Sequence, residues 1–184
     1  MVTPEQMRLL GEWGVTASMQ PMFDGLWGGT DSLYAQRLGE ERSLAMNSFA
    51  SLNRAGVALA FGSDTPVTPF DPWGAVRAAS HHHNPAERLT VRAAFNAHTR
   101  GGWRAARRDE GGVIAPGAPA SIAVWDVPGE LAVQTPDARV AAWSTDPRAG
   151  VPLLPDLHPD LDLPTCVLTL VHGRVAFEEP GALT

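Results

Sequence analysis

The sequence predicts an α/β fold built on a parallel sheet, followed by an all-β tail. Residues 57–61 are an unbroken apolar run, typical of a strand buried on both faces of a parallel sheet. A helix, a Gly-Val step and a strand occur twice, with Gly14 and Gly56 at matching positions. This repeat suits a βα barrel or a doubly wound sheet. From Gly111 onward, short apolar runs separated by Pro and Gly indicate β structure.

The composition is that of a globular chain, because 44% of the 184 residues are hydrophobic and 18% are charged. A net charge of -6, with no concentrated basic run beyond the arginines at 104, 107 and 108, argues against a nucleic-acid partner. The single cysteine, Cys166, excludes an intrachain disulfide framework and favours a reducing, cytoplasmic location. No apolar run has the length of a membrane span, so no membrane partner is expected.

The chain begins with a helix signal. Thr3 is a predicted N-cap with Gln6 three residues later, and a proline occupies the first helical position, so we expect a helix to about residue 13. A glycine then ends the helix, and residues 15–19 have the pattern of a short strand.

The region between the two strands combines a loop and a helix in this prediction. Residues 22–37 are rich in Gly and aromatics and are predicted to be a long loop, which at this end of a barrel is commonly functional. Residues 40–55 are predicted as one helix, because Ala45, Phe49 and Leu52 recur at helical spacing.

Polar residues follow the central strand. Gly62 allows the chain to turn, and Ser63 and Asp64 come directly after it, where α/β folds place their chemistry. Asp64 is therefore the first candidate functional residue. An aspartate at this position also commonly caps a turn, so the local pattern leaves both alternatives open.

Three adjacent histidines follow the next predicted helix, which Asp71 caps and which ends near residue 80. Side chains of neighbouring residues point in different directions, so His81, His82 and His83 do not easily converge on one metal ion. We expect exposed loop histidines near a helix C-terminus, where the helix dipole favours positive charge. The metal-binding motifs HExxH and CxxC are absent.

A further helix is predicted from the N-cap Thr90 to about residue 106. Ala94, Phe95 and His98 fall on its apolar face, so we expect His98 to be a core or interface histidine.

The tail contains two kinds of segment. Residues 147–164 are a loop rich in Pro, Leu and Asp, and His172 and Gly173 form a two-residue hairpin turn between the last two runs. Strands are predicted at residues 112–114, 121–125, 131–133, 140–143, 166–171 and 174–177.

These motifs together carry a family resemblance. Gly-Ser-Asp-x-Pro-Val at residues 62–67 and Asp-Pro-Trp-Gly-Ala at 71–75 resemble the final barrel strand and following loop of the amidohydrolase superfamily, in its amidohydrolase-3 or YtcJ-like branch. Residues 17–21 resemble the seventh strand, and residues 89–100 the helix that links the barrel to a small β domain. Residues 112–126 resemble a motif of that domain.

The resemblance implies a fold and an activity. Residues 1–106 would be the C-terminal part of a (β/α)8 TIM barrel, comprising its last two βα units, and residues 107–184 a small β-sandwich (composite) domain. The activity would be metal-dependent hydrolysis of C–N bonds in small non-peptide substrates, with a divalent metal, zinc in this prediction. Asp64 would be both a metal ligand and the catalytic proton acceptor. Many relatives carry Asp where this chain has Ser121, and that Asp is usually structural.

The resemblance also implies what the chain lacks. The family's other metal ligands precede the segments found here, so the chain is expected to be part of a longer enzyme and inactive alone. Gln20 is expected to be only a polar loop residue. The expected partners are an amide-like small molecule and either a missing N-terminal barrel half or a second copy of the chain.

Two alternatives remain. A non-catalytic fragment or barrel-completing subunit would act through association, because an unpaired edge on the strand at residues 15–19 would recruit another strand. A doubly wound binding domain is less favoured, because the sequence contains neither GxGxxG nor GxxxxGK.

Overall fold

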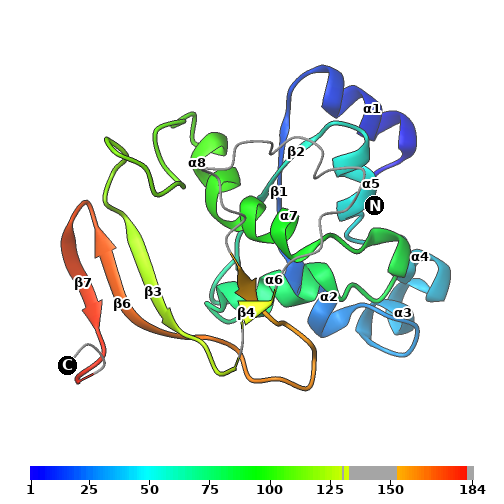
Figure 1. The fold of residues 1–184 in the computed structure, drawn as a ribbon. Coiled ribbons are helices and arrows are strands. Elements are labelled where there is room, and N and C mark those ends of the chain that lie inside the picture. Colours follow the sequence, from blue (N-terminus) through cyan, green and yellow to red (C-terminus); the bar gives the residue numbers. More distant parts are fainter. Residues whose placement is uncertain (130, 133–152, 182–184) are drawn as a thin grey trace.

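The computed structural model describes residues 1–129, 131–132 and 153–181. Figure 1 shows a two-stranded parallel sheet among helices and, at the left, an antiparallel sheet formed by the tail. The described part is thus mixed α/β, with parallel pairing first and antiparallel pairing later along the chain.

The parallel sheet is formed by β1 (Thr16–Met19) and β2 (Ala58–Phe61). Met19 pairs with Phe61, so both strands end at the same edge of the sheet. Ala60 and Phe61 are buried whereas Ala58 is exposed, so burial on both faces holds only for the second half of β2. Among the described residues, no further strand pairs with either of them.

Helix α1 (Pro4–Glu12) begins at the predicted capping box. The Thr3 backbone N–H donates to Gln6 Oε1 at 2.8 Å, and the Gln6 N–H donates to Thr3 Oγ1 at 3.2 Å. Two N–H groups without intrahelical partners thus find acceptors. Met7 then packs against Leu52 in a small apolar cluster.

The loop predicted at residues 22–37 is largely helical, so this prediction was wrong. The segment contains α2 (Pro21–Trp27) and α3 (Leu33–Leu38). The proline occupies the first helical position of α2, where its missing N–H has no consequence. The glycines and aromatics that indicated a loop lie within and between these short helices.

The single helix predicted at residues 40–55 is two helices, α4 (Glu40–Leu44) and α5 (Phe49–Arg54). Asn47 interrupts them, because its φ of 53° lies in the left-handed region, where a right-handed helix cannot continue. Ala45 is exposed at this break rather than buried on an apolar face.

The predicted caps at Asp71 and Thr90 are confirmed. Asp71 Oδ1 accepts the N–H of Gly74 at 2.8 Å, and Thr90 Oγ1 accepts the N–H of Ala93 at 3.1 Å. They begin α6 (Pro72–Ser80) and α7 (Val91–Asn96), which are separated by the short 3₁₀ turn η1 (Pro85–Glu87).

The helix after Thr90 contains a turn that the periodicity did not predict. The chain continues from α7 through one π-helical segment, η2 (Ala97–Gly101), into α8 (Gly102–Ala105). This segment packs directly on β2, where a Cβ added at Gly101 would lie 2.3 Å from the carbonyl oxygen of Leu59. Glycine therefore permits the close approach of helix and strand.

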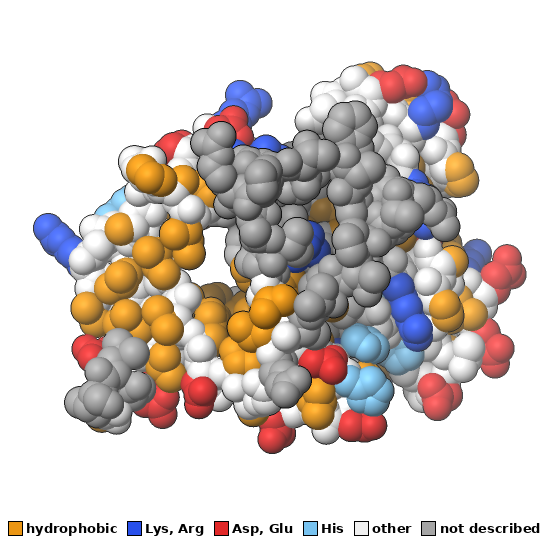
Figure 2. Space-filling view, in the orientation of Figure 1, with side chains coloured by type: hydrophobic (Ala, Val, Ile, Leu, Met, Phe, Trp, Pro, Cys, Tyr) orange, Lys and Arg blue, Asp and Glu red, His pale blue; other side chains and the backbone are white. Residues whose placement is uncertain are grey.

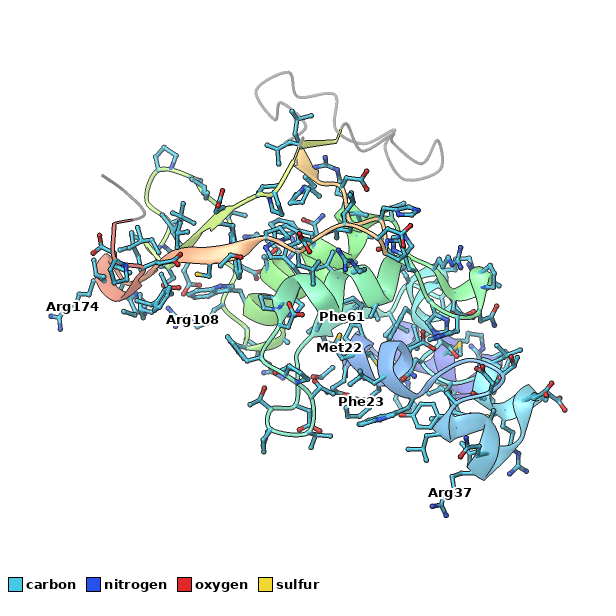
Figure 3. The ribbon with its side chains drawn as sticks, turned by 90° about the horizontal axis from the view of Figure 1, so that it is seen from below. Met22, Phe23, Arg37, Phe61, Arg108 and Arg174 are labelled. Atoms are coloured by element: carbon cyan, nitrogen blue, oxygen red, sulfur yellow. The ribbon has the colours of Figure 1, made fainter. Side chains whose placement is uncertain are left out.

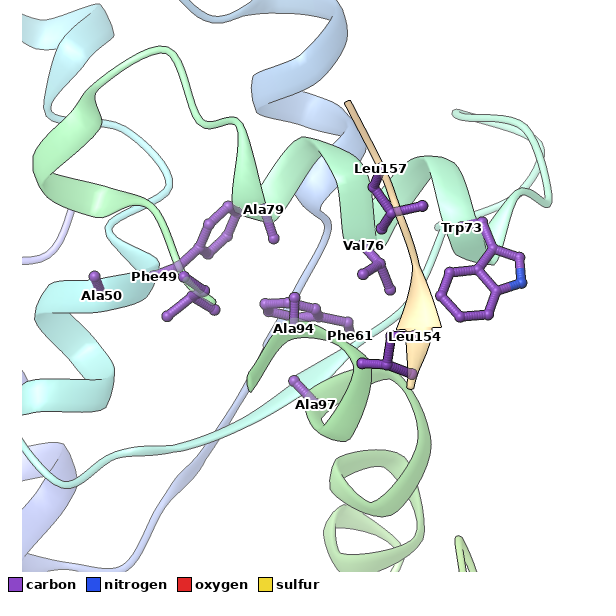
Figure 4. Packing of buried hydrophobic residues seen from close by; sticks show 11 residues of the cluster. Phe49, Ala50, Phe61, Trp73, Val76, Ala79, Ala94, Ala97, Leu154 and Leu157 are labelled. Atoms are coloured by element: carbon purple, nitrogen blue, oxygen red, sulfur yellow. The ribbon is translucent and has the colours of Figure 1, made fainter. Parts of the chain in front are cut away.

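The main core joins distant parts of the chain. Phe49 and Phe61 lie with ring centroids 5.3 Å apart, and Trp73 stacks on Phe95 at 5.5 Å. Two leucines that follow the undescribed segment enter the same core, as Figure 4 shows beside Val76. Its buried members are Phe49, Ala50, Phe61, Trp73, Val76, Ala79, Leu89, Ala94, Ala97, Leu154 and Leu157.

The tail forms β structure, as predicted, and its strands pair in antiparallel sheets. Its strands are β3 (Ile122–Asp126), β4 (Leu131–Ala132), β5 (Leu154–Pro155), β6 (Thr165–Val171) and β7 (Arg174–Glu178). One sheet has the order β3-β6-β7, and β4 pairs with β5. The strand predicted at 112–114 does not form. The strand predicted at 140–143 lies outside the described residues.

The hairpin turn between β6 and β7 is confirmed. His172 and Gly173 have φ values of 48° and 77°, as a two-residue turn matched to strand twist requires. Ser121 Oγ accepts the backbone N–H of His172 at 3.2 Å, so the serine supports this turn.

Candidate functional site

Asp64 lies three residues beyond the end of β2 and is exposed. The Gly62 N–H donates to the carbonyl of Met19 at 3.1 Å, so the hydrogen bonds between the two strands end two residues before Asp64. Figure 3 views the molecule from below, the side of the strands' carboxyl ends, and labels Phe61 at the end of β2 and Met22 and Phe23 at the start of α2. The loop carrying Asp64 and helix α2 thus leave adjacent strands at one edge.

The loop after β2 is stabilised by hydroxyl groups. Thr65 N–H and Oγ1 lie 3.3 and 2.8 Å from Ser63 Oγ, and Thr65 Oγ1 donates to the carbonyl of Thr68 at 3.1 Å. The buried Thr68 hydroxyl donates to the carbonyl of Ser63. These bonds hold the turn without the carboxylate of Asp64.

The Asp64 carboxylate forms no hydrogen bond or ion pair with the described residues. Its backbone carbonyl accepts the N–H of Val67 at 2.8 Å, and its φ is 57°, a conformation that aspartate tolerates better than most residues. The turn-capping alternative for its side chain therefore gains no support, and the carboxylate is available to a ligand.

The described residues alone do not fit a zinc ion. No group of three or more His, Cys, Asp or Glu side chains in residues 1–129, 131–132 and 153–181 could hold a metal. Asp64 supplies one carboxylate, whereas a catalytic zinc site uses about three protein ligands.

The prediction of exposed histidines after α6 was wrong for His82, which is fully buried. Its Nδ1 accepts the Asn84 N–H at 2.9 Å, and its Nε2 lies 3.1 Å from the Asn47 carbonyl. Burial is the largest influence on the pKa of His82 and lowers it, so the ring is neutral. Because Nδ1 faces a donor and Nε2–H an acceptor, neither nitrogen is free to bind a metal.

A buried aspartate of α2 lies against the histidines. Asp24 is 1% exposed, and its Oδ2 accepts both the backbone N–H and the Nδ1–H of His83 at 3.0 Å. Its Oδ1 lies 3.2 Å from His82 Nε2 without a well-aligned hydrogen bond. Small residues allow α2 and α6 to pack closely, since a Cβ added at Gly25 of α2 would lie 3.1 Å from the Cβ of Ala78 of α6.

Sequence reasoning missed Asp24 because it falls in a segment predicted as loop, 59 positions from its partner. The only signal was the histidine run itself, since one buried imidazole usually implies a polar partner elsewhere. His81 is half-buried, with Nδ1 3.1 Å from Ser80 Oγ, and does not join the Asp24 cluster.

A second buried carboxylate was also missed. Glu87 accepts the backbone N–H of Ser51 at 2.9 Å and the hydroxyl of the same serine, which fixes η1 to α5. It lines an open groove of about 480 Å³ between α1, α4, α5 and η1, together with Met7, Glu41 and Arg54. Asp64 does not line this groove.

Two residues considered in the sequence analysis remain, His98 and Gln20. His98 lies on η2 with Nε2 buried and unpaired, and burial is the main cause that lowers its pKa. It is partly buried, in agreement with a core or interface position. The Gln20 side chain does not cap α2, which begins beside it.

The structure and the sequence lead to one class: an α/β chain with an exposed carboxylate at the carboxyl ends of parallel strands. A family model described as "Amidohydrolase family" (Amidohydro_3) matches residues 1–177. The chain belongs to the amidohydrolase family.

Several enzymes of known structure have a similar fold. Metal-dependent hydrolases from Pyrococcus furiosus and Pyrococcus horikoshii OT3, both titled uncharacterized, are each 27% identical over 65% of this chain, with TM-scores of 0.56. A prolidase solved with N-methylphosphonate-L-proline is 18% identical over 97% of this chain, with a TM-score of 0.52, which shows the fold alone.

The chain is short relative to these structures. It spans 25% and 26% of the two Pyrococcus chains and 39% of the prolidase chain. No curated protein sequence matches it. No helix in the described part of the chain is long and apolar enough to cross a membrane.

Proposed function

We propose that this chain supplies Asp64 to a metal-dependent hydrolase that cleaves C–N bonds in small non-peptide substrates. The observation that carries the proposal is the Asp64 carboxylate: it is exposed, free of hydrogen bonds to the described residues, and placed after a parallel strand of an amidohydrolase-family chain. Loops at this edge of α/β sheets carry catalytic residues.

Asp64 has the chemistry for proton transfer. An ionised carboxylate can accept a proton from an attacking water and return it to the leaving nitrogen. The same oxygens are suitable ligands for a divalent cation such as zinc. The other ligands must come from outside the described residues, which contain no metal-binding group.

The test compares Asp64→Asn with Asp31→Asn in the longest natural form of the protein. Asp31 is also exposed, in the loop before α3, so its substitution is a matched loss of one charge. Hydrolysis of formamides and N-acyl amines is followed with and without a chelator. We expect Asp64→Asn to lower kcat/KM by at least about 10²-fold and Asp31→Asn to leave it unchanged. Chelator-resistant activity that survives Asp64→Asn would overturn the proposal.

A second candidate function is association without catalysis. The outer edge of β1 has no strand beside it in the described part, and an isolated two-stranded sheet is marginally stable. Apolar side chains of the antiparallel sheet are also open to solvent, including Val175 at 60% and Phe177 at 49% exposure. Figure 2 shows such side chains gathered over this sheet at the left.

Such surfaces favour a subunit that completes a barrel with another chain or pairs with its own copy. The mass of the 184-residue chain by light scattering at micromolar concentration tests self-association. A dimer or larger assembly that Val175→Asp dissociates would support this candidate. A monomer that recruits no amidohydrolase barrel segment on mixing would contradict it.

A further inference from the structure

The pair Asp24 and His83 has the geometry of an oriented imidazole. The two residues lie on α2 and just after α6, and both the main-chain and the ring N–H of His83 reach one carboxylate oxygen at 3.0 Å. The aspartate is 1% exposed, whereas the histidine side chain is 43% exposed. A buried carboxylate thus fixes an imidazole that stands at the surface.

This contact sets the tautomer of His83. An ionised carboxylate only accepts hydrogen bonds, so Nδ1 carries the proton and Nε2 keeps its lone pair. The second carboxylate oxygen of Asp24 lies near Nε2–H of the buried His82. This N–H group is a favourable neighbour for a negatively charged carboxylate. His82 itself has no lone pair to offer, because both of its nitrogens are engaged.

Nε2 of His83 forms no hydrogen bond with the described residues. The ring lies over Gly29, where an added Cβ would come 2.9 Å from Cδ2 and 3.5 Å from Nε2. Gly29 has a φ of 94°, which also favours glycine. The absence of a side chain there leaves room for the ring in this orientation.

We propose that Asp24 and His83 form a proton-accepting site, in which Nε2 of His83 takes a hydrogen bond or a proton from a ligand hydroxyl or ammonium group. Asp24 is the positioning residue, and His83 is the group that contacts the ligand. A carboxylate on one imidazole nitrogen and an open lone pair on the other is the arrangement that orients a general base.

The lone pair can be probed chemically with diethyl pyrocarbonate. Nε2 attacks one carbonyl carbon, a C–O bond breaks, and the departing ethyl carbonate decomposes to carbon dioxide and ethanol. The Nδ1 proton is released, with Asp24 placed to accept it and pass it on, and it balances the proton that the ethyl carbonate takes up to form ethanol. Peptide mapping by mass spectrometry then gives a separate rate for each histidine.

We expect His83 in the 184-residue chain to be modified several-fold faster than His172, which is exposed on a hairpin turn. Asp24→Asn should bring the rate of His83 down to that of His172, whereas Asp31→Asn should not change it. A purely structural contact would not make His83 more reactive. Equal rates for His83 and His172 in the unmodified chain would overturn the proposal.

A measurement without substitution covers the case in which Asp24→Asn does not fold. Long-range ¹H–¹⁵N correlation spectra should show His83 protonated at Nδ1 and His82 at Nε2. Addition of ethanolamine, which carries both a hydroxyl and an ammonium group, should shift the His83 Nε2 resonance and leave His172 unchanged. Protonation of His83 at Nε2 alone, or no response to ethanolamine, would contradict the site.

Discussion

At the scale of single residues, hydrogen bonds restrict the protonation of one buried histidine. The residue is His82: each ring nitrogen has a backbone partner, and the ring also meets Phe49 edge-on at 5.4 Å. A proton added to Nδ1 would face the N–H of Asn84 and lose the bond it now accepts. The neutral form is therefore part of the folded structure.

The first prediction concerns the stability of the fold at acid pH. Burial lowers the pKa of both His82 and His98 in the folded chain, so the unfolded chain binds more protons below its own histidine pKa of about 6.5. This part of the stability is present above that pH and is lost as the pH falls from there toward the lowered folded values. The urea midpoint should decrease as the pH is lowered from 7.5 to 5.5. The free energy of unfolding should decrease by up to about 1.4 kcal/mol per pH unit for each additional proton that the unfolded chain binds.

His82→Gln should reduce this slope, because the glutamine amide does not titrate. His172→Gln is the control, since that histidine is exposed on a turn. A midpoint that does not change with pH would show that neither buried imidazole resists protonation.

The second prediction uses the adjacent glycines at the junction of η2 and α8. A Cβ at Gly101 would lie 2.3 Å from the Leu59 carbonyl oxygen, whereas Gly102 has no atom within 4 Å of the corresponding position. Gly101→Ala should destabilise the fold by about 1–3 kcal/mol through overpacking. Gly102→Ala should be neutral or stabilise it by up to about 1 kcal/mol, because alanine favours a helix. Equal effects in denaturant unfolding would contradict the close packing of η2 on β2.

At the scale of elements, local signals predicted most starts and turns. The N-caps at Thr3, Asp71 and Thr90 can be predicted from neighbouring residues, because each capping hydrogen bond joins residues three positions apart. The turn at His172 and Gly173 is equally local. These features need no knowledge of the rest of the fold.

The predictions from sequence failed where contacts between distant residues decide the local structure. Helices α2 and α3 are too short to be stable alone, and α2 is held by packing on α6. The pairing of Asp24 with His83 spans 59 positions, so no local sequence pattern predicts it. Asp64 could be chosen in advance because its place depends on one strand and its end, although its role stays a prediction.

The third prediction concerns the hairpin of the tail. Gly173 has a φ of 77° in the turn between β6 and β7. Gly173→Ala should cost about 1 kcal/mol or more, because alanine is strained in this conformation. Gly173→Asn should cost less, since asparagine tolerates it better. Thermal unfolding of both variants provides the measurement, and equal costs would argue against a left-handed conformation at this position.

At the scale of the whole molecule, the described part carries one candidate metal ligand. We predict that the 184-residue chain binds zinc weakly and without fixed stoichiometry, because no group of ligating side chains exists in that part. It should also be inactive when assayed alone. Isothermal titration calorimetry at neutral pH measures the binding, with Asp64→Ala as the variant. A tight one-to-one site that survives this substitution would place the ligands elsewhere.

The position of Leu154 and Leu157 bears on how the molecule loses its structure. Both side chains are at most 5% exposed and lie in the same core as Phe61 and Trp73, although more than eighty positions separate them along the chain. Closing such a long loop costs conformational entropy before the contacts form, so we expect this contact to form late in folding. Once made, it ties the tail to the helices over the parallel sheet. Heat or denaturant should then melt both regions in a single cooperative step, and a protease cut between residues 133 and 152 need not separate the two pieces.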